Sequence, residues 1–266
     1  MGLASDLYRG RNDFDFPRLW VRVGIVSTVL IIISLASMVT RGLNLSIDFE
    51  GGSVWEVPSE TFTEAQARTA LADFGDSAVE RFQEATTTEG GRVIRVSGRV
   101  DNVAEGAKAA DALAEASGLE KGEVKVNTVG PSWGSDITSQ ARLSLIVFMV
   151  LVAAYIAWRL ETRMAIAAMV AVIHDIIITV GVYSVFQIEV TPATVISFLT
   201  ILGFSLYDTI VVYDRVQENA TRFGRSGQYT YTSIMRRSLN QVFMRSLNTT
   251  MVTIIPVISI LVVGQI

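Results

Sequence analysis

An apolar stretch that contains a carboxylate constrains the fold of this chain more than any other feature. Residues 195–214 read VISFLTILGFSLYDTIVVYD, long enough to cross a bilayer as a helix, with Asp208 inside the run. A charged side chain in a membrane costs about 2.5–3.5 kcal/mol on insertion scales, so Asp208 should face protein or water. At about 100° per residue, Thr194, Ser197 and Ser205 share its side of the helix. The stretch predicts a membrane helix with a polar stripe turned into a bundle.

The composition extends this prediction to the whole chain. Hydrophobic residues make up 50% and charged residues 18% of the 266 residues, more apolar surface than a soluble protein of this length buries. The first apolar run competes with a signal peptide, but the polar segment before it is long and acidic and the run exceeds a normal hydrophobic region. We expect an uncleaved, multi-pass α-helical bundle, with helices at 20–40, 140–158, 164–186, 192–213 and 246–266.

Between the first two apolar runs, residues 41–137 have the pattern of a folded α+β domain. Alternating apolar residues predict strands at 43–49, 53–57, 92–97 and 123–129, with another near 78–84. A capping box at Thr63 opens a helix with Ala67, Leu71 and Phe74 inside, and a second helix follows at about 103–116. The expected apolar stripe of that second helix is Ala107, Ala110, Leu113 and Ala114. The order β-β-α-β-β-α-β predicts a ferredoxin-like domain.

The charge and the rare residue types exclude several function classes. From Arg41 to Asp136 there are 17 acidic against 9 basic residues, which makes nucleic acid an improbable partner. The chain has no cysteine and a single histidine, which argues against a zinc site or a thiol nucleophile. Without a nucleophile–base–acid set, we expect no enzyme activity, no metal and no cofactor.

Arginine placement predicts the orientation in the membrane. Arginines precede the first helix, join the second to the third, and crowd the segment between the fourth and fifth, as the positive-inside rule requires of cytoplasmic loops. We therefore expect cytoplasmic segments at 1–19 and 214–245, and an extracytoplasmic domain at 41–137. The chain ends at Ile266 within an apolar run, which suggests truncation.

Several motifs resemble those of the SecD/SecF family of bacterial protein-export membrane proteins, within the RND superfamily. Each motif is modest alone, and their order and spacing make the resemblance specific to SecF-type chains. The motifs lie at 42–52, 129–134, 172–175, 202–209, 213–215, 238–241 and 245–250.

The resemblance implies a proton-driven accessory of the Sec translocase in the cell inner membrane. It implies a SecD-like partner, the SecYEG channel, YajC, and contact with the translocating preprotein and the lipid bilayer. It also implies six transmembrane helices, so the sixth would lie beyond residue 266. Two alternatives remain open from the residues: an RND-type half-transporter for small molecules or lipids, and a passive scaffold. The family's intramembrane aspartate corresponds to Asp208 and its nearby arginine to Arg245.

The residues themselves leave the site roles open. Asp208 can carry a proton or hold helices together through hydrogen bonds, and Arg245 can be its counter-charge or an anchor that reaches the headgroups. His174 and Asp175 lie near the middle of the third helix, where a proton relay and structural support are both consistent with the pattern. We expect polar support of the proton-coupling pair from His174, Asp175, Ser205, Asn248 and Thr249.

Overall fold

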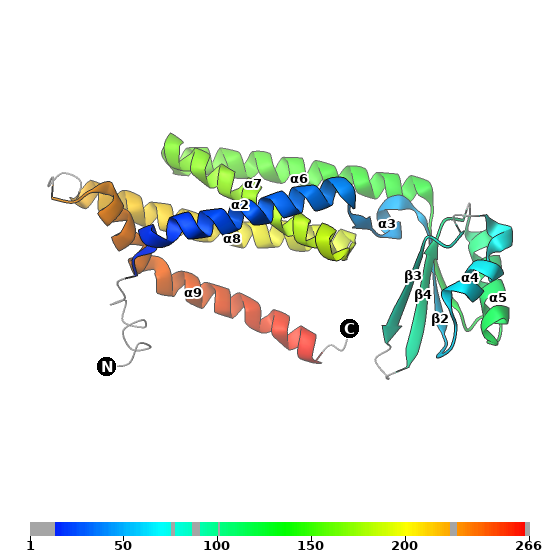
Figure 1. Ribbon diagram of the computed structural model, residues 1–266. Coiled ribbons are helices and arrows are strands. Elements are labelled where there is room, and N and C mark those ends of the chain that lie inside the picture. Colours follow the sequence, from blue (N-terminus) through cyan, green and yellow to red (C-terminus); the bar gives the residue numbers. More distant parts are fainter. Residues whose placement is uncertain (1–13, 76–77, 87–90, 101, 224–227, 264–266) are drawn as a thin grey trace. The chain divides into compact units, whose positions relative to one another are not determined.

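The structure, a computed structural model, describes residues 14–75, 78–86, 91–100, 102–223 and 228–263. The chain divides into two compact units, each described here by itself (Figure 1). The first contains residues 14–44, 145–188 and 196–263, and the second contains residues 45–144 and 189–195.

Long apolar helices make up the first unit. Within the described residues, five helices are long and apolar enough to cross a membrane, which confirms the expected α-helical class and makes this a multi-pass membrane protein. Proline stands at or next to the start of three of them, where its missing amide costs nothing. The helices are α2 (Phe16–Thr40), α6 (Pro131–Arg159), α7 (Thr162–Phe186), α8 (Pro192–Phe223) and α9 (Tyr231–Val263).

The polar segment 214–245, expected to be a loop, is mostly helical, and that expectation is wrong. Helix α8 continues to Phe223 and α9 already begins at Tyr231. Side chains across this polar hairpin explain the extension: Asn219 donates hydrogen bonds to Ser238 (2.9 Å) and to Gln241 (2.8 Å). The segment was taken for a loop because it is polar, but its polar groups bond to one another between two helices.

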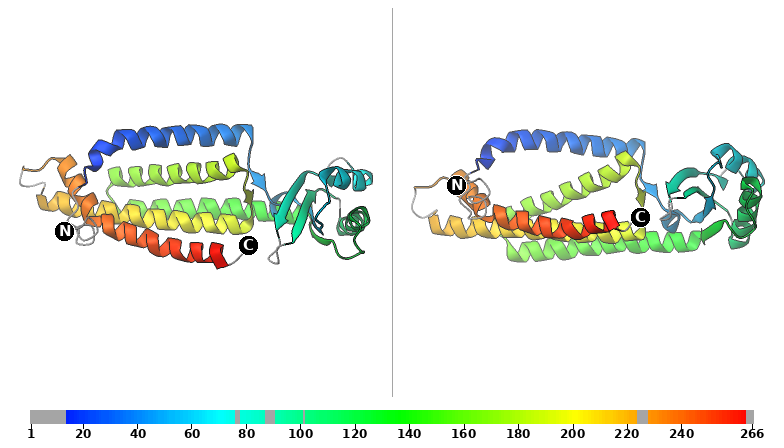
Figure 2. Two further views of the ribbon diagram at one scale, coloured as in Figure 1. Left: turned by 60° about the horizontal axis from the view of Figure 1, so that its bottom comes forward. Right: turned by 90° about the horizontal axis from the view of Figure 1, so that it is seen from below.

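Helices α2 and α7 pack closely through small residues, as membrane helices commonly do. Ser37 and Ser184 share a buried hydrogen bond of 2.9 Å, and a Cβ added to Gly181 would lie 2.0 Å from the Ser34 hydroxyl oxygen. In Figure 2, α7 runs between α2 and α8, and this position lets its side chains reach both neighbours.

The second unit has the expected ferredoxin-like fold. The strands are β2 (Gly52–Pro58), β3 (Arg81–Thr86), β4 (Arg92–Gly98) and β5 (Lys125–Val129), in the antiparallel order β3-β4-β2-β5. Helices α4 (Glu64–Ala70) and α5 (Val103–Ser117) complete the β-α-β-β-α-β order and pack together on one side of the sheet (Figure 1). The capping box at Thr63 is present, with its side chain and that of Gln66 bonded reciprocally.

The expected strand at 43–49 is wrong. Only β1 (Asn44–Leu45) is extended, and it pairs with the short strand β6 (Glu189–Val190). The next residues form one helical turn, α3 (Ile47–Glu50), capped by Gly51 at φ 75°. Alternation over so few residues does not distinguish a strand from a helical turn that buries a single side chain, here Phe49.

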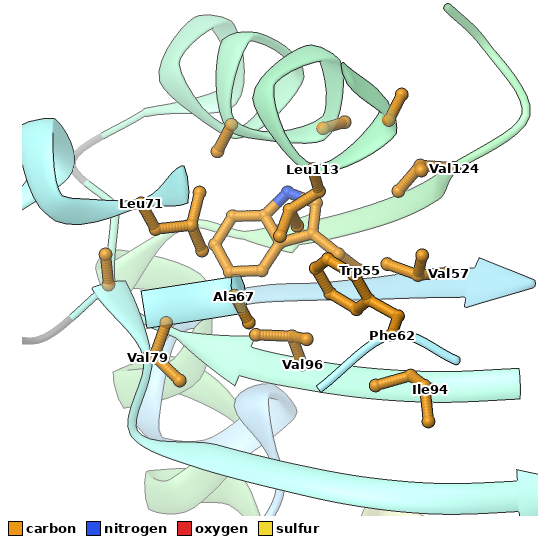
Figure 3. Packing of buried hydrophobic residues seen from close by; sticks show 14 of the residues in the cluster. Trp55, Val57, Phe62, Ala67, Leu71, Val79, Ile94, Val96, Leu113 and Val124 are labelled. Atoms are coloured by element: carbon orange, nitrogen blue, oxygen red, sulfur yellow. The ribbon is translucent and has the colours of Figure 1, made fainter. Parts of the chain in front are cut away.

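Trp55 lies at the centre of the α+β core and is fully buried, as are Phe62, Leu71 and Leu113 (Figure 3). Its indole nitrogen donates to the carbonyl of Gly106 in α5 (2.9 Å), so this large residue is buried without losing a hydrogen bond. Two of the expected core positions differ from the structure: Ala107 lies outside the core, and Phe74 is only partly buried.

Ala107 is exposed, because α5 turns Gly106, Ala109 and Ala110 inward instead. Phe74 is half-buried at the edge of the cluster. It stands at the end of a short 3₁₀ turn after α4, so it does not continue the helix face.

The glycines at 51–52 and 134 let backbone approach backbone. Gly52 has φ 122°, and a Cβ there would lie 2.7 Å from the carbonyl oxygen of Gly98. A Cβ on Gly134 would lie 2.8 Å from the carbonyl oxygen of Phe49 and 2.9 Å from the amide nitrogen of Gly51. Thr138, one turn further along α6, donates to the same Phe49 carbonyl (3.2 Å). The double glycine is therefore a packing and turn feature.

Candidate functional site

Asp208 on α8 and Arg245 on α9 are close enough to interact electrostatically. The guanidinium of Arg245 attracts the carboxylate of Asp208, and the hydroxyl of Ser246 donates a hydrogen bond to it. Arg245 also donates to the hydroxyl of Tyr207 (2.7 Å), with its guanidinium carbon 5.8 Å from the centre of that ring. The cation therefore has a neutral hydrogen-bond partner on α8, Tyr207, and the carboxylate of the next residue, Asp208, attracts it at longer range. This is the arrangement that an exchange of partners would need.

A second polar cluster crosses the bundle from α2 to α8. The hydroxyl of Ser27 lies 2.6 Å from Nε2 of His174, and Nδ1 of His174 lies 3.0 Å from Oδ1 of Asp175. The hydroxyl of Ser205 donates to the other carboxylate oxygen, Oδ2 of Asp175. His174 and Asp175 are neighbours in sequence, yet they reach different helices because successive side chains diverge by about 100°.

The expected supporting residues divide into two groups. His174, Asp175 and Ser205 belong to the connected cluster, and Ser205 stands three residues before Asp208 on α8. Asn248 is exposed, and Thr249 donates its hydroxyl to the carbonyl of Arg245 in its own helix (3.0 Å). Neither observation gives Asn248 or Thr249 a place against Asp208.

A cavity of about 550 Å³ with several polar lining residues lies between α6, α8 and α9 and reaches Arg245. Tyr207 and Arg245 line it, together with an ion pair of 2.6 Å between Arg159 and Asp214. By the helical rise, Asp208 lies about 9 Å along α8 from Asp214. The cavity thus brings polar surface from the charged end of the bundle to the Arg245 side chain.

Sequence reasoning missed three contributors: Ser27, Tyr207 and Ser246. A hydroxyl in an apolar helix often bonds to its own backbone, so Ser27 carries no signal by itself. Tyr207 fits the pattern of an aromatic residue at the membrane interface. Ser246 directly follows Arg245, and its short polar side chain has no distinguishing pattern of its own. Among the described residues, no group of three or more His, Cys, Asp or Glu side chains could hold a metal ion.

The bundle and the ferredoxin-like unit define a class: a multi-pass membrane protein with one α+β domain. Residues 108–266 match the family "Protein export membrane protein SecD/SecF, C-terminal", and residues 36–61 match the "SecD/SecF GG Motif". The chain belongs to the SecD/SecF family.

Two curated relatives are similar over 98% of the chain. Protein translocase subunit SecF of Streptomyces coelicolor is 37% identical over 268 residues, and the chain covers 69% of that protein's length. The subunit of the same name in Mycobacterium tuberculosis is 38% identical over 274 residues, and the chain covers 60% of it. The chain therefore spans about two thirds of the length of these relatives.

A crystal structure of SecDF from Thermus thermophilus, described as a translocon-associated membrane protein, has the same fold with a TM-score of 0.77. The two sequences are 24% identical, and the match covers all of this chain and 35% of the SecDF chain.

Proposed function

We propose that this chain is a SecF-type subunit that uses the proton-motive force to promote protein translocation across the bacterial inner membrane. The observation that carries the proposal is a carboxylate in an apolar helix, Asp208, next to the residue Tyr207 to which Arg245 of α9 donates a hydrogen bond, inside a chain of the SecD/SecF family. The names of the relatives favour protein export over the alternative of a half-transporter for small molecules or lipids. Relatives and fold support a SecD-like partner, and with it we propose SecYEG, YajC and the translocating preprotein.

The proposed cycle alternates the charge on Asp208. Ionised, the carboxylate attracts Arg245; protonated, it releases the guanidinium to Tyr207, which already accepts a hydrogen bond from it. Each proton that crosses the membrane delivers about 2.3 kcal/mol per 100 mV. That free energy is enough to bias an equilibrium between two conformations of similar stability.

The orientation belongs to the same proposal. The N-terminus and the polar hairpin between α8 and α9 are cytoplasmic, and the ferredoxin-like domain is extracytoplasmic, because arginines gather in the cytoplasmic segments. A proton would then enter from the side of that domain and leave toward the polar cavity near Arg245.

Asp208→Asn tests the proposal, because the amide keeps the shape of the carboxylate but cannot carry a proton. We expect this variant to co-purify with its SecD-like partner and to lose the stimulation of preprotein export by a proton gradient in membrane vesicles. Arg245→Met should lose the same stimulation. The control is Asp214→Asn, which removes only the ion pair with Arg159 and should leave the stimulation near wild type. If the Asp208→Asn variant kept full proton-gradient stimulation of export, the proposal would be wrong and helix α8 would have only a structural role.

A further inference from the structure

The side chains of Ser27, His174, Asp175 and Ser205 form one hydrogen-bonded row across three helices. By the helical rise, Ser27 lies about 17 Å from the start of α2, His174 about 18 Å from the start of α7, and Ser205 about 20 Å from the start of α8. All three distances fall near the middle of a membrane crossing about 30 Å thick. The row is therefore a polar layer at mid-membrane depth.

Each member of the row can both give and take a proton or a hydrogen bond. When Nδ1 of His174 donates to the ionised Asp175, Nε2 is left as the acceptor for the hydroxyl of Ser27. An imidazole with a partner at each nitrogen can gain a proton at one and lose a proton at the other. The row consequently has the connectivity of a proton path.

Helix packing alone does not account for the imidazole and the carboxylate. The same two helices, α2 and α7, are already joined by the Ser37–Ser184 hydrogen bond and by the close contact at Gly181. Those contacts use small neutral residues, which carry little desolvation cost in a membrane. An ionisable pair at mid-depth is expensive and usually marks an ion or proton pathway.

We propose that His174 and Asp175 are a second proton-transfer site, which passes protons between Ser27 on α2 and Asp208 on α8. The inference rests on the proposed function, since it assigns Asp208 as the group that exchanges protons with the row. Ser205 precedes Asp208 by three residues, so the two side chains lie on the same face of α8 one turn apart.

The transfer balances as follows. A hydronium ion at Ser27 gives a proton to the Ser27 hydroxyl and becomes water, while the hydroxyl passes its own proton to Nε2 of His174. Nδ1 then releases its proton to Asp175. The protonated Asp175 passes a proton to the hydroxyl of Ser205, which gives its former proton to Asp208. One proton enters the row at Ser27 and one leaves it to Asp208. Each member of the row has its starting charge again, and the starting state returns when the serine hydroxyls rotate back and the His174 proton returns to Nδ1.

The experiment measures proton-gradient-driven preprotein export and proton uptake in membrane vesicles that contain the full chain with its SecD-like partner. His174→Gln keeps hydrogen bonding but cannot be protonated, and we expect both signals to fall by about tenfold or more. Ser27→Ala and Ser205→Ala should lower both signals, while Ser205→Thr, which keeps the hydroxyl, should retain them.

Two reference variants separate the outcomes. Ser37→Ala removes the other hydrogen bond between α2 and α7 and should leave both signals near wild type. If Asp208→Asn loses stimulation while His174→Gln keeps it, the row is not a relay and only this inference falls. If Asp208→Asn keeps stimulation, the proposed function falls first.

Assembly decides whether His174→Gln reports on transfer. Should that variant fail to co-purify with the SecD-like partner, the comparison of Ser205→Ala with Ser205→Thr takes its place. Equal stimulation by those two variants would overturn the relay, and loss in the alanine variant alone would support it.

Discussion

Gly52 adopts a backbone conformation that side chains rarely tolerate, at a point where two strands meet. Its φ is 122°, and an added Cβ would lie 2.7 Å from the carbonyl oxygen of Gly98, which is backbone and cannot move aside. Gly118 also has a positive φ, 75°, but nothing lies within 4 Å of its added Cβ. The two positions therefore separate steric clash from backbone strain.

We predict that Gly52→Ala destabilises the ferredoxin-like domain by more than about 2 kcal/mol, since the clash adds to strain of about 1–3 kcal/mol. Gly118→Ala should cost only about 1–2 kcal/mol, the strain of a left-handed residue. Urea unfolding of the domain, followed by the fluorescence of buried Trp55, measures both. Equal losses at the two positions would mean that β2 shifts to absorb the new methyl group.

For single residues, the sequence allowed the charged candidate site residues to be predicted but not the hydroxyl groups that contact them. Asp208 and Arg245 are recognisable because an ionised group in or beside an apolar run is costly and needs a reason. Ser27 gives no such signal: only the structure shows that its hydroxyl reaches His174. The neutral partner of Arg245, Tyr207, was missed for the same reason, since a tyrosine near the end of a membrane helix is common.

Among the elements, α2 and α7 approach each other too closely at Gly181 for a larger residue to fit. A Cβ on Gly181 would lie 2.0 Å from the hydroxyl oxygen of Ser34 and 2.9 Å from its Cα, so the helices would have to separate. Gly203, in α8, has nothing within 4 Å of its added Cβ. Both are glycines of membrane helices, so they form a matched pair.

We predict that Gly181→Ala lowers the thermal stability of the detergent-solubilised protein, while Gly203→Ala leaves it equal or higher, since alanine favours a helix over glycine by about 1 kcal/mol. Cysteines introduced at Ser37 and Ser184, which are in hydrogen-bond contact, should cross-link less efficiently in the Gly181→Ala background. Unchanged cross-linking would show that α2 and α7 tolerate the extra methyl group without separating.

In the ferredoxin-like domain, depth of burial should order the cost of truncation. Leu113→Ala removes a fully buried side chain and should destabilise the domain by about 2–5 kcal/mol. Phe74→Ala should cost less than the 3–5 kcal/mol typical of a buried phenylalanine, because the ring is only half-buried. Urea unfolding of both variants provides the comparison, and a larger loss for Phe74→Ala would place the ring deeper than it lies here.

Helices and strands were predicted correctly where one sequence pattern extends over many residues. They were predicted wrongly where a short stretch fits both the strand period and the helix period. The apolar runs are long enough for only one interpretation, and the capping box at Thr63 marks its helix start through specific bonds. The stretch 43–49 is too short for period to decide, and a helical turn ends at Gly51. The polar stretch 214–245 resembled a loop because the partners of Asn219 lie on the following helix, and local sequence does not show a pairing across a turn.

On the scale of the whole molecule, charge is divided sharply between its parts. The segment from Arg41 to Asp136 is acidic, while arginines stand at 215, 222, 225, 236, 237 and 245 between the last two apolar runs. Short basic segments are retained in the cytoplasm during insertion, whereas Asp and Glu contribute little to orientation. The arginine placement therefore supports the proposed orientation, with the ferredoxin-like domain outside.

Cysteine labelling tests that orientation directly, because the chain has no native cysteine to interfere. We predict that a cysteine at Ser59, just after β2, reacts with a membrane-impermeant maleimide added outside spheroplasts. A cysteine at Gln228, exposed in the hairpin between α8 and α9, should react only after the membrane is opened. The two positions are separated by three of the proposed crossings, α6, α7 and α8, an odd number that must place them on opposite sides. Labelling of both from outside would overturn the orientation, and with it the direction in which Asp208 is proposed to release its proton.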